Sequence, residues 1–568
     1  MTPQERERIT SNEYADLLIG YYGDERRLQE FGDATIQIIN FFTAVVHVPV
    51  ERITENIVAE LGYSVMPSLF GIISTASLEA SGIIRLRNIP NLNLRGQGVL
   101  VGIIDTGIDY TNPIFQYEDK TTKIVSIWDQ TIQSETPPPG LNYGTEYTRE
   151  QLNQALQTEN PLEVVPTTDE VGHGTMIAGI SAGRDVPESG FFGVAPEAEL
   201  VVVKLKPAKT YLKNFFRVPE TAICYQENDI IFGIEYLIQV AYQLNRPLAI
   251  CIALGTSQGA HDGRGTLSSF LSHQGEFVGV SIAVAAGNEG SARRHYYGVV
   301  DPAIGYDTVE LNIGENEQGF SMELWGDSPS TFSIDILTPT GEYVPRIAIS
   351  LDESREITFV FEQTVIFVDY QMIESQSGDQ LILIRFRNPT PGIWRFGVYT
   401  RGDIQLGFHI WLPMAGFISD NTFFISSNPY TTILSLGNAF VPMTVTAYNV
   451  EDDSLYTAAS RGYTRIGLVK PDFAAPGVDI LAPSLDGGFS LVTGTSAAAA
   501  HTTGVAAILL EWGILRNNFP NMNTLNMKNL IIRGARRDSD TQYPNMNWGY
   551  GILDVFNIFE TLRRGIGD

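Results

Sequence analysis

Four continuous apolar runs constrain the fold of this chain more than any other feature of its sequence. They read GVLVGIID (98–105), ELVVVKL (199–205), PLAICIALG (247–255) and GVSIAVAAG (279–287). None of them alternates apolar with polar residues, which is typical of strands buried on both faces of a parallel sheet. A segment with helical spacing of apolar residues, 228–245, lies between two of these runs. We therefore predict an α/β fold built on a doubly wound, mostly parallel sheet.

Two regions depart from this pattern. Residues 1–76 mix short helical and strand-like segments and predict a small α+β unit, which would bury little core alone. Residues 303–435 contain short β-rich runs separated by turn clusters such as GDSPS and TPTGE, which predict an inserted β-sandwich or jelly roll. The α/β unit would then be formed by 77–302 and 436–568.

The charge and the terminal sequence exclude several classes of protein. The chain has 568 residues, with 37 basic and 65 acidic side chains and a net charge of −28, which disfavours nucleic acid as a partner. No apolar run reaches the roughly 18 residues that span a bilayer, and the N-terminal segment MTPQERERIT lacks the apolar core of an export signal. We expect a soluble protein with no membrane partner, and we expect Cys224 and Cys251 to be free buried thiols.

Four short motifs fall where α/β sheets place active sites, at the carboxyl ends of strands and the N-termini of helices. Asp105 ends the run GVLVGIID, and Asn288 follows the run that ends in AVAAG. His173 begins a small-residue helix in VGHGTMIAG, and Ser496 begins another in TGTSAAAA. Each motif alone has an ordinary structural explanation, as a turn or a helix start. Together they supply every part of a serine nucleophile system.

The roles follow from the chemistry of a serine hydroxyl, which is a poor nucleophile at neutral pH. His173 would accept its proton, and Asp105 would orient the imidazole and stabilise the imidazolium. Asn288 and the backbone N–H of Ser496 would form the oxyanion hole. An alternative nucleophile is Ser257, because GTSQG (255–259) has the GxSxG form of a nucleophile elbow after a strand. That alternative leaves the other three motifs without a function.

In this order, the four motifs resemble those of the subtilisin-like serine proteases, the subtilases of peptidase family S8. The segments GVAPEAELVVVKL, KPDFAAPGVDILAP and WGYGILDV resemble other core segments of that family. The resemblance implies a serine endopeptidase that requires no cofactor for catalysis. It also allows for a structural calcium ion, although the sequence places no metal ligands. It further implies that substrate binds between two short segments, Ala253, Leu254 and Gly255 on one side and Ala285, Ala286 and Gly287 on the other.

Residues 1–76 resemble the family's prodomain, which assists folding, is removed by self-cleavage and inhibits by leaving its end in the cleft. On this basis the partners are a protein or peptide substrate and the chain's own prodomain. We expect self-cleavage between about Ile73 and Ser81, with Ala76 as the preferred P1 residue because it is small.

The insert, the IWDQT segment (127–131) and the LLEWGI segment (509–514) narrow the resemblance to the clostridial Csp proteases. These germination proteases activate a cortex-degrading hydrolase in spores, which implies a cytoplasmic or spore-associated location. Some members of that group have lost triad residues and act as sensors or scaffolds. A non-catalytic scaffold whose cleft is blocked by the N-terminal unit is therefore the alternative function. We interpret the insert as a structural clamp rather than as a binding module.

Overall fold

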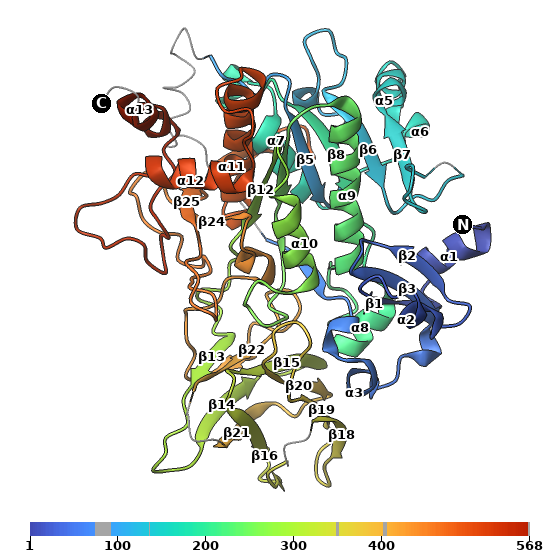
Figure 1. Cartoon of the computed structure of the whole chain (residues 1–568), viewed down its shortest axis with the longest axis vertical. Helices are drawn as coiled ribbons and strands as arrows, with labels where there is room; N and C mark the ends of the chain where they lie inside the picture. The colour runs from blue at the N-terminus through green and yellow to red at the C-terminus, as the bar shows by residue number, and fades with distance from the viewer. Residues whose placement is uncertain (74–92, 136, 348–350, 402–405, 566–568) are drawn as a thin grey trace.

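The computed structural model describes residues 1–73, 93–135, 137–347, 351–401 and 406–565 (Figure 1). Its centre is an eight-stranded sheet in which the neighbours run parallel except for the last strand, β7, which is antiparallel to β6. In spatial order, the strands are β25 (Phe473–Pro476), β24 (Met443–Tyr448), β12 (Val280–Ala285), β10 (Leu248–Ile252), β5 (Leu100–Asp105), β8 (Glu199–Lys204), β6 (Ile124–Asp129) and β7 (Thr145–Thr148). The predicted doubly wound, mostly parallel α/β sheet is confirmed.

Helices cover both faces of this sheet, which explains why its central strands β5, β10 and β12 are almost entirely apolar and buried. Along β5, Val101 and Ile103 belong to the core shared with helices α7 (His173–Ala182) and α11 (Thr495–Leu510). Leu100 and Ile104 belong to a second core on the opposite face. The helices that contribute to that second core are α9 (Glu227–Leu244) and α10 (Thr266–Gln274).

The remaining helices lie around these elements, and several of them add residues to the first core. They are α1 (Pro3–Thr10), α2 (Arg26–Gln29), α3 (Ile57–Leu61), α5 (Arg149–Leu156), α6 (Pro161–Val164), α8 (Thr210–Phe216), α12 (Thr524–Gly534) and α13 (Val555–Gly565). In the part of the chain that the structure describes, the helical segment Thr495–Leu515 is long and apolar enough to cross a membrane, but 83% of its apolar window is buried. It includes α11, whose residues are buried throughout, so its hydropathy is that of a core helix.

The N-terminal unit is built on a three-stranded antiparallel sheet, in the order β1 (Tyr14–Gly20), β3 (Thr43–Pro49) and β2 (Thr35–Ile38). Its apolar face shares a core with helix α8 of the central unit, because Leu17, Val46 and Phe216 belong to one cluster of buried residues. A buried ion pair joins the same two parts, because Asp16 Oδ1 accepts from Lys209 Nζ at 2.6 Å. The small unit therefore completes its core against its neighbour, as its size requires.

Two antiparallel sheets form the insert. The first has the order β13 (His295–Gly298), β22 (Phe408–Trp411), β15 (Gly319–Gly326), β20 (Gln380–Arg387), β19 (Val365–Gln371) and β18 (Asp352–Thr358). The second has the order β17 (Tyr343–Val344), β16 (Thr331–Leu337), β21 (Gly392–Arg401), β14 (Asp307–Ile313) and β23 (Phe423–Phe424). One apolar core draws on both sheets. The insert is therefore a β-sandwich, as predicted.

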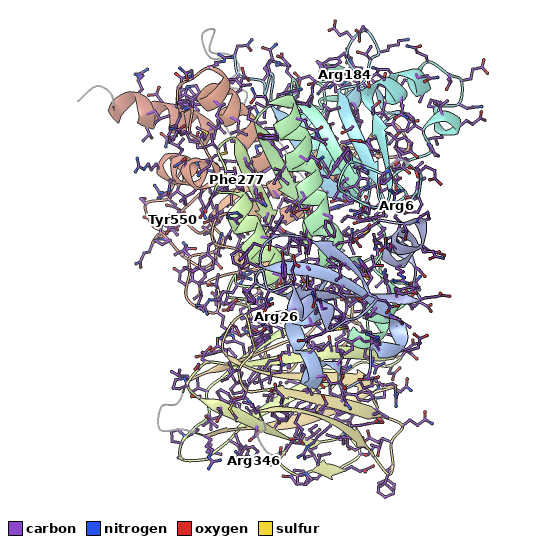
Figure 2. The ribbon with its side chains drawn as sticks, turned by 45° about the vertical axis from the view of Figure 1, so that its right-hand side comes forward. Arg6, Arg26, Arg184, Phe277, Arg346 and Tyr550 are labelled. Atoms are coloured by element: carbon purple, nitrogen blue, oxygen red, sulfur yellow. The ribbon has the colours of Figure 1, made fainter. Side chains whose placement is uncertain are left out.

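The N-terminal unit lies at the junction between the central unit and the sandwich (Figures 1 and 2). Figure 2 shows Arg26 of this unit between Arg184 of the central unit and Arg346 of the sandwich. Glu55 links the three parts, because its carboxylate accepts from Arg217 Nη2 at 2.5 Å and from Arg385 Nη1 at 2.7 Å. The two cysteines, Cys224 and Cys251, are both free and buried, as expected.

Candidate active site

Three side chains from distant parts of the sequence meet at the carboxyl edge of the central sheet. His173 Nδ1 lies 2.7 Å from Asp105 Oδ1, and His173 Nε2 lies 3.3 Å from Ser496 Oγ. Asp105 is the last residue of β5, His173 is the first of α7, and Ser496 is the second of α11. All three are buried. The structure thus brings together the three residues that the sequence motifs single out.

The protonation state of the imidazole depends on its two neighbours. Burial lowers the pKa of His173, but the Asp105 carboxylate and the Ile73 carbonyl outweigh that effect, and the pKa rises above its ordinary value of 6.5. Asp105 Oδ1 also accepts from the backbone N–H of Thr106 at 2.7 Å, which fixes the carboxylate. A buried imidazole held in this way can accept a proton from one side and keep its orientation.

Asp169 is a positioning residue that the sequence motifs do not reveal. Its Oδ1 accepts from Thr106 Oγ1 at 2.7 Å and from Gly172 N at 2.8 Å, and its Oδ2 accepts from Thr175 N at 2.9 Å. It therefore caps the first turn of α7 and ties that turn to the residue after Asp105. Its place four residues before His173, at the start of a predicted helix, is the signal that could have found it.

Asn288 lies beside the first turn of α11. Its Oδ1 accepts from the backbone N–H and from the hydroxyl of Thr495, each at 3.2 Å. Thr495 Oγ1 also accepts from Gly287 N at 3.0 Å, so the loop after β12 and the start of α11 are held together. These bonds identify Oδ1 as the acceptor end of the Asn288 amide and the nitrogen as its donor end.

The N-terminal unit ends inside this site. Its last described strand, β4 (Leu69–Ile72), lies between β11 (Leu254–Gly255) and β9 (Tyr225–Gln226) in a small antiparallel sheet. Ile73 N donates to Ala253 O at 3.3 Å, and Ile73 O lies 2.7 Å from His173 Nε2. The segment 69–73 therefore runs through the cleft as an extended peptide that ends at the three buried side chains. The preferred P1 residue of the sequence prediction, Ala76, lies outside the described residues.

The two short segments expected to bind substrate face the end of this peptide from opposite sides. A Cβ on Gly255 would lie 3.0 Å from Ile73 Cδ1 and 2.4 Å from Leu434 Cδ1. A Cβ on Gly287 would lie 2.6 Å from Leu434 Cγ. Leu434 N donates to Ala286 O and Ser435 N donates to Thr256 O, so the loop carrying Leu434 bridges both segments. Leu434, which no sequence motif marks, thus lies between the walls formed by Ala253, Leu254, Gly255, Ala285, Ala286 and Gly287.

The alternative nucleophile, Ser257, is not on a nucleophile elbow. It follows β11, and the next helix, α10, begins only at Thr266. A nucleophile elbow requires a sharp strand-to-helix turn at the serine, which is not the geometry here. Ser257 instead contributes its backbone carbonyl, which lies 3.0 Å from His261 Nε2.

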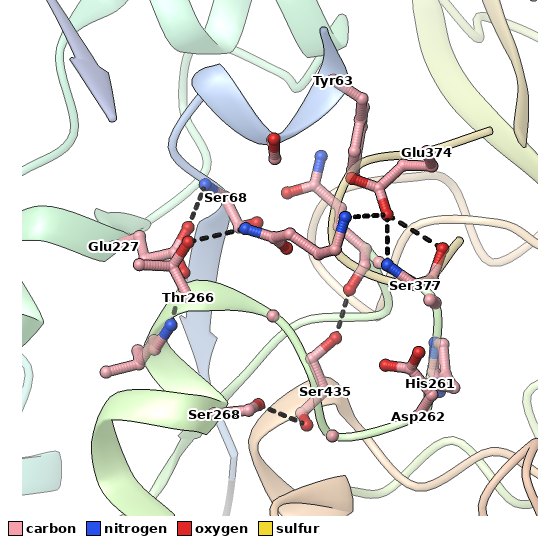
Figure 3. A pocket seen from close by; sticks show the side chains of 18 of the residues that line it. Tyr63, Ser68, Glu227, His261, Asp262, Thr266, Ser268, Glu374, Ser377 and Ser435 are labelled. Atoms are coloured by element: carbon pink, nitrogen blue, oxygen red, sulfur yellow. Dashed lines mark hydrogen bonds between the residues drawn. The ribbon is translucent and has the colours of Figure 1, made fainter. Parts of the chain in front are cut away.

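A small cavity lies beside the peptide, where the N-terminal unit, the central unit and the sandwich meet (Figure 3). Two buried carboxylates border this junction. Glu227 accepts from Ser68 N at 3.1 Å and from Leu267 N at 2.9 Å. Glu323 accepts from Tyr63 Oη at 2.7 Å and from Gly259 N at 2.9 Å. Burial raises the pKa of both carboxyl groups. Each bridges the N-terminal unit to the central unit.

Comparisons with known proteins agree with this geometry. The model of the subtilase family, Peptidase S8, matches residues 96–313 and 425–551, which is more than half of the chain. Among solved structures, the CspB protease of Clostridium perfringens is 30% identical, with a TM-score of 0.75, covering 85% of this chain and 98% of that one.

Two curated relatives are longer proteins. The subtilisin-like protease SBT1.9 of Arabidopsis thaliana is 24% identical over 457 residues, which are 73% of this chain and 57% of that protein. The C5a peptidase of Streptococcus pyogenes is 24% identical over 445 residues, which are 73% of this chain and 35% of that protein. The chain thus spans about a third to somewhat over half of their lengths. The family model and the structural match together show that this chain belongs to the subtilase family of peptidases.

Proposed function

We propose that the chain is a serine endopeptidase in which Ser496 is the nucleophile, His173 the general base and Asp105 the group that orients the histidine. The observation that carries this proposal is the position of His173, with Nδ1 on Asp105 and Nε2 within 3.3 Å of Ser496 Oγ. Membership of the subtilase family supports it. Ser496 Oγ attacks the peptide carbonyl, and His173 Nε2 accepts the hydroxyl proton.

The same imidazole then completes the reaction. It gives its proton to the leaving amine as the carbon–nitrogen bond breaks, and water later hydrolyses the acyl ester on Ser496. The developing oxyanion would be stabilised by Asn288 Nδ2 and by the backbone N–H of Ser496 at the N-terminus of α11. The bonds from Thr495 to Asn288 Oδ1 support this assignment, because they fix which end of the amide is the donor.

The first substrate that we propose is the chain itself, cleaved after Ile73. Ile73 is the residue whose N–H binds Ala253 O and whose carbonyl lies at the imidazole, so it occupies the P1 position of the bound peptide. Ile72 and Gly71 then occupy P2 and P3, paired with β11. This proposal moves the expected P1 residue from Ala76 to Ile73, within the range 73–81 that the sequence suggests.

Intact mass and N-terminal sequencing of the purified chain test both proposals. We expect wild-type protein to yield two fragments, the second beginning at Ser74, and Ser496→Ala to remain a single chain. Because the hydroxyl is the only group removed, a Ser496→Ala chain that is still cut at this bond would contradict the assignment. Ser257→Ala is the matched control, since it removes a nearby serine hydroxyl and should leave cleavage unchanged.

A second candidate is a non-catalytic scaffold, and one observation favours it. Segment 69–73 fills the cleft and is held by strands on both sides, so a substrate could enter only after the segment leaves. A fluorogenic peptide assay separates the two functions after the mass analysis. Hydrolysis that depends on Ser496 identifies an enzyme, whereas a chain that is cut once and then inert to peptides is a self-processed scaffold.

For the physiological role, we propose activation of a cortex-hydrolase zymogen during spore germination. The support is the similarity to the CspB protease of Clostridium perfringens over 98% of that chain, together with the resemblance of the insert and flanking motifs to the Csp group. Incubation of the purified protein with a cortex-hydrolase precursor tests it. Shortening of the precursor by wild type but not by Ser496→Ala is the expected result.

A further inference from the structure

Gly71, the proposed P3 residue of the cleft-bound peptide, has no side chain, and the space beside its Cα is filled by neighbouring residues. It lies two residues before Ile73 and pairs with Gly255 in the small antiparallel sheet. Its φ is not in the positive range, so its backbone conformation suits any residue. A requirement for glycine at this position therefore comes from the side chains that surround it.

Two apolar side chains close the space above Gly71. A Cβ built on Gly71 would lie 3.3 Å from Met414 Cε, from Met414 Sδ and from Phe417 Cε1. Contacts this short are tighter than ordinary packing, so even alanine would displace its neighbours by a few tenths of an ångström. Met414 and Phe417 are each only 3% exposed and belong to the same core cluster as Ile73 and Leu434. A longer side chain would have to displace the end of the Met414 side chain and the Phe417 ring, and both are packed in the core.

The turn that carries these residues, 414–417, follows strand β22 of the sandwich and is bonded to the residue after Asn288. Ala415 N donates to Glu289 Oε1 at 3.0 Å, and Phe417 N donates to Met414 O at 3.1 Å. Glu289 directly follows Asn288, is buried, and forms an ion pair with Arg294 at 2.9 Å. These bonds tie the backbone of the turn to the loop that carries Asn288, so a larger P3 residue would have to be accommodated by the buried side chains of Met414 and Phe417.

We propose that the Met414–Phe417 turn closes the S3 position of the cleft, and that protein substrates of this enzyme carry glycine three residues before the cleaved bond. The inference rests on the proposed function and defines its substrate class: segments of the form Gly-x-aliphatic, cut after the aliphatic residue. A bulkier P3 residue overpacks a closed site, and overpacking by a few carbon atoms costs about 1–3 kcal/mol, which corresponds to about fivefold to 150-fold in rate.

The rate of self-cleavage of the full chain measures the effect of this contact directly. We expect Gly71→Val to slow cleavage after Ile73 by about tenfold or more, and Met414→Ala to recover most of that loss in the double variant. Ala415→Ser is the matched control, because it changes the same turn at an exposed position and keeps the backbone N–H. Gly71→Val cleaving at the wild-type rate, or equal recovery by Ala415→Ser, would overturn the inference.

Peptides provide the same comparison in trans. The cleaved enzyme is given Leu-Phe-Xaa-Ile-Ile-Ser-Thr-Ala with Gly, Ala or Val at Xaa, and kcat/KM is expected to fall in that order. Met414→Ala should reduce the difference between Gly and Val by about tenfold. Equal kcat/KM for the three peptides would contradict a closed S3 position even though the enzyme is active.

A thermal double-mutant cycle in the Ser496→Ala chain separates this inference from the proposed activity. There Gly71→Val should lower Tm through the clash alone, and Met414→Ala should restore part of it, so that the two effects are not additive. Coupling in this cycle with an uncut wild-type chain would mean that the proposed function fails while the closed site stands. Additive effects together with Ser496-dependent cleavage would mean that the proposed function stands while the closed S3 position fails.

Discussion

At the scale of single residues, Leu434 sets the size of the site that receives Ile73. Its side chain fills the space between the Gly255 and Gly287 walls and is 1% exposed. Ile73, a branched residue of medium size, fits the room that remains. No motif reveals Leu434, because it lies about 180 residues from Gly255 and only the fold brings the two together.

We therefore predict that Leu434→Ala shifts the P1 preference toward phenylalanine. Removal of three carbon atoms opens room for a larger ring, and each buried methylene is worth about 0.8 kcal/mol, or about 2.4 kcal/mol for three, so kcat/KM for a P1 Phe peptide relative to P1 Ile should rise by up to about fiftyfold. Peptides that differ only at P1 measure this ratio. If the variant has lower activity but the same order of kcat/KM for the two peptides as the wild type, Leu434 does not limit the size of this site.

The residues that perform the proposed chemistry were predictable from their motifs taken together, whereas the residues that shape specificity were not. Asp105, His173 and Ser496 stand at strand ends and helix starts, where local sequence and the sheet rule fix their common edge. Met414 and Leu434 belong to loops whose course depends on how the sandwich packs against the central unit. Nothing in their local sequence encodes that packing.

At the scale of elements, helix α7 owes its position to Asp169. Loss of this carboxylate would leave the N–H groups of Gly172 and Thr175 and the hydroxyl of Thr106 without their acceptor. Because a lost cap costs about 1 kcal/mol and displaces the base, we predict that Asp169→Ala lowers kcat by about tenfold with little change in KM.

The neighbouring Glu170 offers a matched control. Its side chain is 66% exposed and pairs with the buried amine of Lys204. Glu170→Gln keeps an oxygen acceptor for that amine, so it should leave kcat unchanged. Steady-state kinetics on one peptide compare the two variants. Equal effects of both substitutions, or an increase in KM alone for Asp169→Ala, would argue against a role in positioning His173.

The elements themselves followed the sequence closely, with one instructive departure. The helical pattern predicted 228–245, whereas α9 spans Glu227–Leu244 with Gln226 as its N-cap, although Asn228 and Asp229 are residue types that often cap helices. Asp229 instead pairs with Lys206 at 2.5 Å and accepts from Tyr143 Oη at 2.8 Å. Asp229, a residue type that often caps helices, is thus part of a buried hydrogen-bond network. Its partners are distant in the sequence, so a local pattern does not predict them.

At the scale of the whole molecule, three histidines join the sandwich to the central unit. His261, from the loop after β11, stacks on Trp411 with ring centroids 4.0 Å apart. His409 and His295, from β22 and β13, stack on the same indole, and His295 Nε2 lies 2.9 Å from His409 Nδ1. All three are buried. Burial lowers the pKa of His295 to about 3 and that of His261 to about 4.

These shifts predict that acid weakens the junction between the sandwich and the central unit. The unfolded chain, with a histidine pKa near 6.5, binds more protons than the folded chain between about pH 3 and 6.5, so stability rises with pH in this window. The contribution of these neutral histidines to the free energy of unfolding is complete above about pH 6.5. It is lost as the pH falls toward their lowered pKa values. For His295 the loss at pH 5 is about 2 kcal/mol.

Thermal unfolding of the full chain between pH 4.5 and 8 tests this dependence. His295→Phe keeps an aromatic ring against Trp411 and removes the titrating group, so its Tm should vary less with pH than that of the wild type. His273, exposed on α10, is the matched control, and His273→Phe should retain the wild-type slope. Only a buried neutral imidazole must gain a proton on unfolding. If the Tm of His295→Phe depended on pH as steeply as that of the wild type, acid would act elsewhere in the molecule.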